Sequence, residues 1–475
     1  MSLLAKILKS NNMLSLANNG LVAVFGLVGF MILVRSLPAT DYGAWVLFIT
    51  ATNFLDMLRF GITRTALVRF LSGAAPEKTK KLIGSNYTIN LITTTLLSAI
   101  VTAIYFLFKS SIDESGYYLF FQWFPVIAFV TLPFNNAQSI LQAKLRFDLI
   151  LLLRMINVGG FMIYLLINMI YFKSPVWVIM TAYLLINILT SLIASLFNWD
   201  GIKYIGYSAK EERKIILDFG KYTTGTLIGS NLLKSADTFI IGLSPFLGTA
   251  GVALYSIPIK LTEIIEIPLR SFAMTAFPKL SKASLEGNTE LVKKLYYQNS
   301  GGLTLFIIPV MIFSFFFAEE FVTFIGGEQY AVTAGIFQVF CLYGMLLPLD
   351  RFTGVALDAV NKPKQNFIKV IYMASANIIG DTLVVFGLYH LIYQMVKSQL
   401  AYKEINIVGY TDNITLNSSI VTLQMVAIVT ILFTLIGIFI GFKYLDKALN
   451  LKFSHIFSES IYFFKDFVHK IKNRS

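Results

Sequence analysis

Four charged residues lie inside one long apolar segment, 252–276, at spacings that place them on one face of a helix. Lys260, Glu263, Glu266 and Arg270 follow one another at steps of three, three and four residues. Residues three or four apart are neighbours on a helical surface, so opposite charges at these steps can pair. The spacing therefore predicts an ionic face on an otherwise apolar helix.

Other apolar segments carry charges of the same kind. Asp56 and Arg59 are three residues apart, and so are Lys234 and Asp237. A charged side chain that faces lipid at mid-membrane costs about 2.5–3.5 kcal/mol, so such residues face protein or water. The candidate binding cations are Arg59, Arg64, Arg154, Lys234, Lys260, Arg270 and Arg351, and the candidate acids are Asp56, Asp237, Glu263, Glu266, Asp350 and Asp381.

Two interpretations of these charges stay open. In the first, the cations line a water-filled cavity and bind a diphosphate, for which the planar fork of arginine is well suited. In the second, the charges neutralise one another and hold helices together. We favour the cavity for Arg59, Arg64 and Arg270, and we favour packing over a proton or Na⁺ site for Asp381. Lys369 lies near a segment end, from which its charge can reach the membrane interface.

The elements that position these residues are transmembrane helices. Of the 475 residues, 56% are hydrophobic and 14% are charged, and the mean hydropathy is +0.70. Soluble domains are about 45–50% apolar and about 25% charged. Continuous apolar runs of about 20 residues predict helices rather than barrel strands. We predict an all-α integral membrane fold of twelve helices, at roughly 14–35, 42–66, 87–108, 118–141, 149–172, 175–197, 219–243, 252–276, 300–318, 331–357, 366–392 and 420–442.

The basic residues alternate between the segments that join these helices. With the N-terminus inside, the cytoplasmic segments hold 25 Lys and Arg and the outer segments hold five. This bias predicts that both ends of the chain are cytoplasmic. We expect a six-helix bundle over 1–200, a cytoplasmic linker over 201–218, a second six-helix bundle over 219–448 and a tail over 449–475.

The tail is predicted to be an amphipathic helix in the inner membrane interface. A solvated, frayed tail is the alternative. The long polar connection 393–419 has no assigned role. The apolar residues of the tail recur at steps of three and four and are Phe453, Phe457, Ile461, Phe464, Val468 and Ile471.

The two halves of the chain repeat a pattern, and motifs in both point to a family. Leu37-Pro-Ala-Thr-Asp-Tyr-Gly-Ala-Trp45 in the first half echoes Leu247-Gly-Thr-Ala-Gly-Val-Ala-Leu-Tyr255 in the second. With Asp56-x-x-Arg59-x-Gly61, Ala236-Asp237-Thr-Phe-Ile-Ile-Gly242 and Phe277-Pro-Lys-Leu-Ser281, the chain resembles the Wzx-type polysaccharide biosynthesis or O-antigen flippases. These belong to the multidrug/oligosaccharidyl-lipid/polysaccharide (MOP) exporter superfamily, and the resemblance covers nearly the whole chain.

The resemblance implies two six-helix bundles around a central cavity. It also implies that an oligosaccharide on a polyprenyl diphosphate crosses from the cytoplasmic to the outer leaflet by alternating access. The implied location is the bacterial inner (plasma) membrane. The implied partners are the lipid bilayer, the lipid-linked sugar and other membrane proteins of polysaccharide assembly.

Other classes of function have weaker support. The sequence has no G-x-x-x-x-G-K-[ST] loop and no nucleophile–base arrangement, so we expect neither an ATP motor nor an enzyme. Cys341 is alone and the three histidines are dispersed, so we expect no metal or cofactor. The net charge of +13 follows membrane topology rather than nucleic-acid binding. The runner-up is a multidrug or cation antiporter of the same superfamily, and a non-transporting scaffold has no feature in its favour.

Overall fold

The structure is an all-helical assembly of two compact units. The computed structural model describes residues 11–71, 74–401, 410–452, 454–456, 458 and 461. Within these residues every regular element is a helix, which confirms the predicted all-α class. The first unit comprises Met1–Asn231 with Gly248–Ala253, and the second comprises Leu232–Leu247 with Leu254–Ser475. The predicted limits of the bundles, linker and tail stay predictions.

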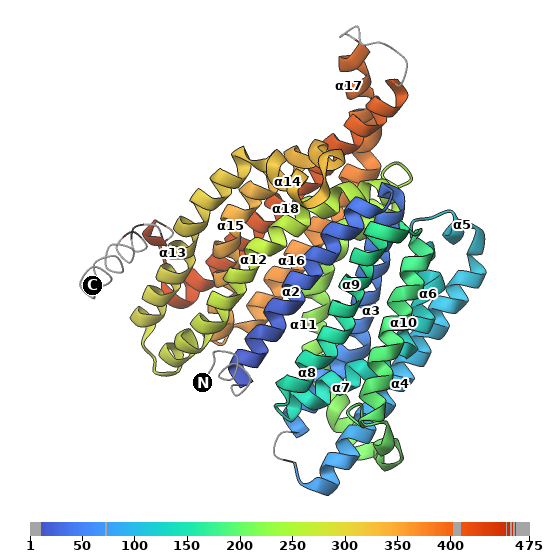
Figure 1. The fold of residues 1–475 in the computed structure, drawn as a ribbon. Coiled ribbons are helices and arrows are strands. Elements are labelled where there is room, and N and C mark those ends of the chain that lie inside the picture. The colour runs from blue at the N-terminus through green and yellow to red at the C-terminus, as the bar shows by residue number, and fades with distance from the viewer. Residues whose placement is uncertain are drawn as a thin grey trace, which may run out of the picture. The chain divides into compact units, whose positions relative to one another are not determined.

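The first unit consists of apolar helices joined by short connections (Figure 1). Backbone groups in lipid must satisfy their hydrogen bonds internally, and a helix does this within one segment. The unit also contains most of α11 (Lys210–Leu243) and the first residues of α12 (Gly248–Leu285). Its other elements are α2 (Asn11–Ser36), α3 (Ala39–Leu71), α4 (Pro76–Leu107), α5 (Lys109–Asp113), α6 (Tyr118–Val130), α7 (Leu132–Ala143), α8 (Phe147–Arg154), η1 (Met155–Gly159), α9 (Gly160–Ile167), η2 (Asn168–Phe172), α10 (Val176–Leu196) and η3 (Ile202–Tyr207).

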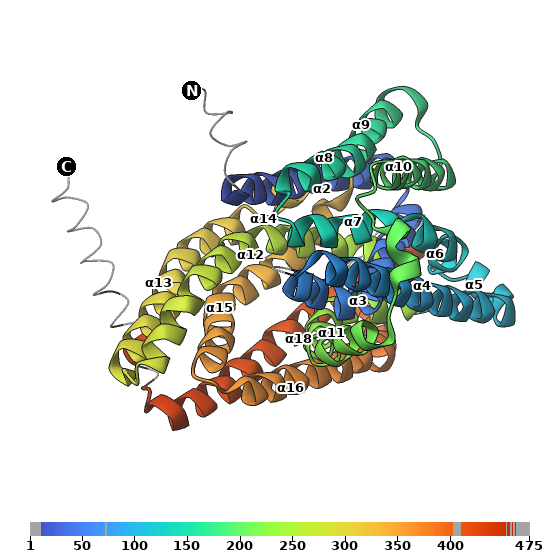
Figure 2. The ribbon, with the colours of Figure 1, turned by 90° about the horizontal axis from the view of Figure 1, so that it is seen from below.

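The second unit contains the remainder of α11 and α12 and all helices that follow. Within it, α15 lies beside both α13 and α18, and α16 lies beside α18 (Figure 2). Its elements after α12 are α13 (Thr289–Phe316), α14 (Ala318–Gly326), η4 (Glu328–Thr333), α15 (Ala334–Ala359), α16 (Pro363–Thr382), η5 (Leu383–Leu388), α17 (Tyr389–Ala401) and α18 (Tyr410–Leu449).

Each of the twelve predicted spans overlaps a helix or a run of helices, but several helices extend well beyond the predicted ends: α4 and α13 both begin 11 residues before the corresponding span. By length and apolarity, eight helical runs of the described residues qualify as membrane spans, or nine if the bent pair α6 and α7 is one span. The apolar part of α2, Gly20–Ser36, is shorter. The helices α11 and α12 are not among the eight, and both carry charges within their length. The fold class is confirmed, whereas the number twelve is not.

Breaks in helix geometry lie next to several polar residues. The axes of α6 and α7 differ by 49° across Thr131, and Pro133 stands in the first turn of α7, where its ring and missing N–H favour a helix start. The π-helical turn η1 directly follows Arg154, and η5 begins two residues after Asp381. Single π-helical turns occur frequently at functional sites. Two candidate site residues therefore stand beside a local change in helix winding.

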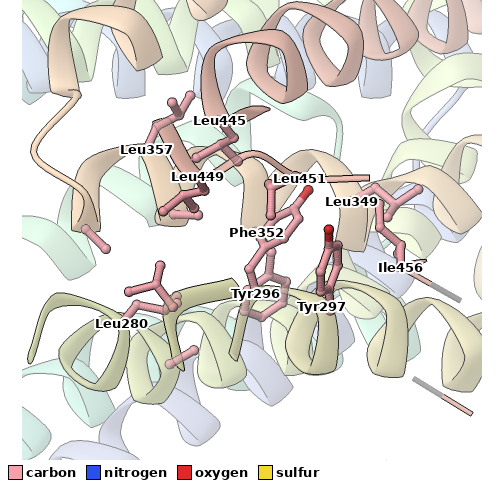
Figure 3. Close-up of a cluster of buried hydrophobic side chains, with 14 of the residues drawn as sticks. Leu280, Tyr296, Tyr297, Leu349, Phe352, Leu357, Leu445, Leu449, Leu451 and Ile456 are labelled. Atoms are coloured by element: carbon pink, nitrogen blue, oxygen red, sulfur yellow. The ribbon is translucent and has the colours of Figure 1, made fainter. Parts of the chain in front are cut away.

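The largest described core of the second unit lies where α12, α13, α15 and α18 approach one another (Figure 3). Leu451 and Ile456, just beyond α18, are buried in this cluster. The backbone N–H of Lys452 donates to the Tyr297 hydroxyl at 2.8 Å, and that hydroxyl donates to the Lys452 carbonyl at 3.2 Å. The beginning of the tail is thus docked on protein. The helix predicted for Phe453, Phe457, Phe464, Val468 and Ile471 lies outside the described residues.

Candidate functional site

The ionic face of α12 forms pairs at the spacings that its sequence predicts. Lys260 Nζ lies 2.8 Å from Glu263 Oε2, and Arg270 Nη2 lies 2.7 Å from Glu266 Oε2. The same Glu266 oxygen accepts a hydrogen bond from Lys234 Nζ on α11 at 3.2 Å. Glu266 therefore connects two helices of the second unit, and one carboxylate faces two cations. The net positive charge favours an anionic ligand.

Several of these charged side chains are accessible on the surface of the second unit. The side chain of Lys234 is 50% exposed, that of Glu263 is 49% exposed and that of Arg270 is 45% exposed. Charged side chains that are this exposed favour contact with water over contact with hydrocarbon.

The adjacent residues Asp350 and Arg351 on α15 have different surroundings. Asp350 Oδ1 lies 2.5 Å from Lys369 Nζ, which also donates to the Asp350 carbonyl at 3.0 Å. Lys369 is 3% exposed, so the expectation that it reaches the membrane interface is wrong. The ammonium group of Lys369 instead pairs with the carboxylate of Asp350. Arg351 is exposed, whereas Asp350 is only partly exposed, so Arg351 is the most accessible of these three residues.

Asp237 and Asp381 belong to one buried polar cluster of the second unit. Asn377 Nδ2 donates to Asp237 Oδ1 at 2.9 Å and to Asp381 Oδ2 at 3.1 Å. Asp237 Oδ2 accepts from the Tyr255 hydroxyl at 2.9 Å and from Thr430 Oγ1 at 3.4 Å. The two carboxylates therefore share one amide donor within a buried cluster. Asp381 is 0% exposed, and its Oδ1 has no hydrogen-bond partner.

In the first unit, Arg59 lies in the protein interior rather than in an open cavity. Its side chain is 0% exposed, its Nη1 lies 3.1 Å from Asp56 Oδ1 and its Nη2 donates to the Ala128 carbonyl on α6 at 2.8 Å. The guanidinium also lies 4.6 Å from the centre of the Phe60 ring. These contacts describe a residue that joins α3 to α6, so the ion-pair interpretation fits Arg59 better than the cavity interpretation does.

Arg64 and Arg154 differ from Arg59 because their charges are not neutralised in this way. Arg64 is half-buried, and its Nε is buried without a hydrogen-bond partner. Arg154 is also half-buried, and its Nε and Nη2 both donate to Gln138 Oε1, at 3.1 and 3.0 Å.

The first unit also contains a buried amide network that the sequence analysis missed. Thr63 Oγ1 donates to Asn90 Oδ1 at 2.7 Å, and the amides of Asn90 and Asn86 both donate to Asn136 Oδ1, at 2.7 and 3.0 Å. A row of polar residues at four-residue steps along α4, two asparagines followed by two hydroxyl residues, could have predicted this network. That row consists of Asn86, Asn90, Thr94 and Ser98, all buried.

The fold defines a class of membrane protein. The structure is similar to an inward-facing multidrug resistance MATE family transporter of the MOP superfamily, with 17% identity and a TM-score of 0.70 over 90% of this chain and 96% of that chain. It is also similar to the lipid II flippase MurJ in an inward closed conformation, with 15% identity and a TM-score of 0.66 over 94% and 90%. A MOP superfamily transporter from Pyrococcus furiosus gives 17% identity and a TM-score of 0.53 over 93% and 95%. The chain is a multi-pass membrane protein with the fold of this superfamily.

The family follows from the sequence itself. The profile of a family described as polysaccharide biosynthesis protein matches residues 32–334, well over half of the chain. The chain belongs to this family, and the resemblance seen in its motifs is confirmed. None of the curated proteins matches its sequence.

Proposed function

We propose that this chain is a flippase for an oligosaccharide linked to a polyprenyl diphosphate. It moves this lipid from the cytoplasmic to the outer leaflet of the bacterial plasma membrane during polysaccharide synthesis, such as that of O-antigen or capsule. Membership of the polysaccharide biosynthesis family supports the pathway, and the superfamily fold supports transport rather than catalysis.

The observation that carries this proposal is the exposed ionic face of α11 and α12. Lys234 and Arg270 share one carboxylate, that of Glu266, so the three residues carry an excess of positive charge. Arg270 uses one Nη on Glu266, which leaves other N–H groups of its fork for phosphate oxygens. A diphosphate that enters this face replaces its hydration with charge-assisted hydrogen bonds, while its polyprenyl chain stays in lipid.

Alternating access completes the transport cycle. The charged face opens first to the cytoplasm, where the lipid-linked sugar is made, and then to the outer side. The membrane potential favours this direction, since moving one elementary charge across the membrane is worth about 2.3 kcal/mol per 100 mV and the interior is negative. Both chain ends are cytoplasmic in this proposal, as the distribution of Lys and Arg predicts.

Glycan export in a strain that lacks the gene tests the proposal. We expect Arg270→Ala to abolish export because it removes the exposed arginine fork from the ionic face. Arg270→Lys should retain part of it, because the charge persists without the fork. Lys397→Ala, an exposed position on α17, is the matched control. Export at the wild-type level with Arg270→Ala would refute a role for this face in carrying the diphosphate.

A second candidate, a cation antiporter, is favoured by the buried Asp237–Asn377–Asp381 cluster, which can hold a proton or a monovalent cation. Purified protein in liposomes separates the two candidates. A flippase moves lipid-linked sugar, whereas an antiporter moves ethidium against a pH gradient and moves no lipid-linked sugar. Asp381→Asn should abolish ethidium movement if the antiporter is correct.

A further inference from the structure

The connection between α10 and α11 is held against the start of α4. A side chain at Gly84 on α4 would collide with the carbonyl of Tyr204 in η3, so the two backbones are in contact. One residue further along α4, Ser85 Oγ donates to the Ala209 carbonyl at 3.2 Å and accepts from the Ala209 N–H at 3.0 Å. Side chains of η3 and of the start of α4 therefore belong to one surface of the first unit.

Two lysines and two tyrosines meet on this surface. The ring centres of Tyr204 and Tyr207 lie 6.3 Å apart, with the rings edge to face. Lys80 Nζ on α4 lies 5.7 Å from the centre of the Tyr207 ring, and Lys203 Nζ lies 5.2 Å from the centre of the Tyr204 ring. Ammonium groups at such distances are attracted by the electron-rich ring face. We call these four residues the linker patch.

The linker patch has an excess of positive charge around it. Lys78 and Lys81 are exposed in the first two turns of α4, on either side of Lys80, and Lys203 is exposed on η3. The acid in those two turns is Glu77, whose Oε1 lies 2.9 Å from Lys80 Nζ. Four lysines against one glutamate leave three positive charges without an acid of their own. A surface with this balance favours an anionic partner.

The same connection carries exposed apolar side chains. Phe197 is 63% exposed and stacks on Trp199 with ring centres 4.9 Å apart, and Ile202 and Tyr207 are 45% and 51% exposed. Asp200, between them in the chain, is 0% exposed, so its carboxylate is not part of this surface. Aromatic rings next to lysines are typical of the boundary between membrane and water. Because η3 begins six residues after α10 ends, it lies within about 20 Å of that helix end.

An anionic phospholipid matches both features of this surface. Its phosphate accepts hydrogen bonds from ammonium groups and tyrosine hydroxyls, and its acyl chains contact apolar side chains. A soluble acidic partner would match the charge and leave the apolar side chains in water.

We propose that the linker patch, with Lys78 and Lys81, binds the head group of an anionic phospholipid and anchors the connection between α10 and α11 to the membrane surface. This role is independent of the proposed function, since it concerns a lipid that stays in its leaflet and is not transported.

Native mass spectrometry of the purified full-length protein measures this binding, with phosphatidylglycerol as the probe and phosphatidylcholine of the same chain length as the neutral comparison. We expect the wild type to bind phosphatidylglycerol more tightly. Lys80→Gln/Lys203→Gln should weaken phosphatidylglycerol binding about fivefold for each lysine removed and leave phosphatidylcholine binding unchanged. The matched control is Lys109→Gln/Lys173→Gln, which removes two exposed lysines of the first unit from predicted outer segments and should bind as the wild type does.

Glu77→Gln tests the same surface in the opposite direction. This variant keeps every residue of the linker patch and frees Lys80 from its acid, so phosphatidylglycerol binding should strengthen several-fold. If the pair of Glu77 and Lys80 only stabilised the first turns of α4, the variant would gain no affinity. Because Glu77 is exposed, the variant also keeps the test decisive if the double lysine variant folds poorly.

Three other results would overturn the proposal. Equal affinity of the wild type for the two lipids would remove the preference for an anionic head group. Wild-type phosphatidylglycerol affinity in Lys80→Gln/Lys203→Gln, or an equal loss in the control pair, would place the lipid elsewhere. Complete displacement of the lipid by inorganic phosphate at equal concentration would assign the linker patch to a free anion instead of a membrane lipid.

Discussion

Individual buried charges in this protein are paired by residues on other helices of the same unit. Lys369 on α16 meets Asp350 on α15, and Arg59 on α3 meets the Ala128 carbonyl on α6. Taking an ion out of water costs several kcal/mol, which a close partner must offset. Such pairs specify how two helices are rotated against each other. They contrast with the exposed ions of α12, which remain available to a ligand.

Lys369→Met is predicted to destabilise the protein, because it leaves the carboxylate of Asp350 without its cation. Breaking a buried ion pair from one side typically costs about 3–5 kcal/mol. Chemical denaturation of the protein in detergent, followed by intrinsic fluorescence, measures this cost. Lys364→Met, at an exposed position five residues earlier, should change the free energy of unfolding little. Recovery of stability in the double variant Lys369→Met/Asp350→Leu would support the pairing, and equal loss in Lys364→Met would contradict it.

At the scale of elements, close backbone approaches and a docked tail connect the helices within each unit. A side chain at Gly84 on α4 would collide with the backbone carbonyl of Tyr204 in η3, and one at Gly43 would collide with the backbone of Thr249. Gly43 belongs to the motif after the first predicted span. These glycines are needed because of contact with another backbone, which a flexible neighbour cannot relieve.

Gly84→Ala should destabilise the first unit, since its Cβ requires the η3 backbone to move. Overpacking of this kind costs about 1–3 kcal/mol. Gly206→Ala in the same short helix is the control, because nothing lies within 4 Å of its added Cβ. Thermal unfolding in detergent compares the two. Equal unfolding temperatures for the two variants would show that α4 and η3 are not held this close together.

Ile456→Ala is predicted to loosen the tail from the second unit. Ile456 is 0% exposed and packs in the cluster with Leu280, Tyr297 and Leu349 (Figure 3). Truncating a buried isoleucine to alanine costs about 2–5 kcal/mol. Limited proteolysis should therefore cut the region after Leu449 faster in this variant. Ile461→Ala, at a position that is 49% exposed, should be cut at the wild-type rate. The same rate for both variants would argue against docking of the tail.

At the scale of the whole molecule, topology and fold address different questions. The superfamily fold accommodates both a multidrug transporter and a lipid flippase among the similar structures, so fold alone does not choose the substrate. The family match points to polysaccharide synthesis. The distribution of basic residues predicts which side of the membrane each end of the chain faces. This orientation defines the cytoplasmic side, from which transport starts in the proposed function.

Cysteine labelling in intact cells is expected to find position 455 inaccessible and position 114 accessible from outside. His455 and Glu114 are both exposed, so His455→Cys and Glu114→Cys should fold normally. The native Cys341 is buried, which keeps the background low. A membrane-impermeant maleimide applied before and after permeabilisation gives the readout. Labelling of position 455 in intact cells would invert or overturn the predicted topology.

The sequence by itself determined what depends on local pattern. Apolar runs of membrane length predicted an all-helical membrane protein, and each predicted span falls on a helix, because backbone groups in lipid leave few alternatives. Spacing within a single helix likewise predicted the pairs Lys260–Glu263 and Glu266–Arg270, because residues three or four apart on a helix are neighbours wherever that helix lies. The family motifs are likewise short segments that can be recognised without the tertiary structure.

Only the tertiary structure decided which helices bring their polar faces together. Lys234 with Glu266, Gln138 with Arg154, and Asp237 with Asn377 are contacts between helices. Each depends on the rotation of one helix against another, which periodicity within either helix does not specify. Backbone acceptors such as the Ala128 carbonyl carry no sequence signal at all. For this reason the sequence predicted accessible cations at Arg59 and Lys369, whereas both residues lie in the interior of the folded chain.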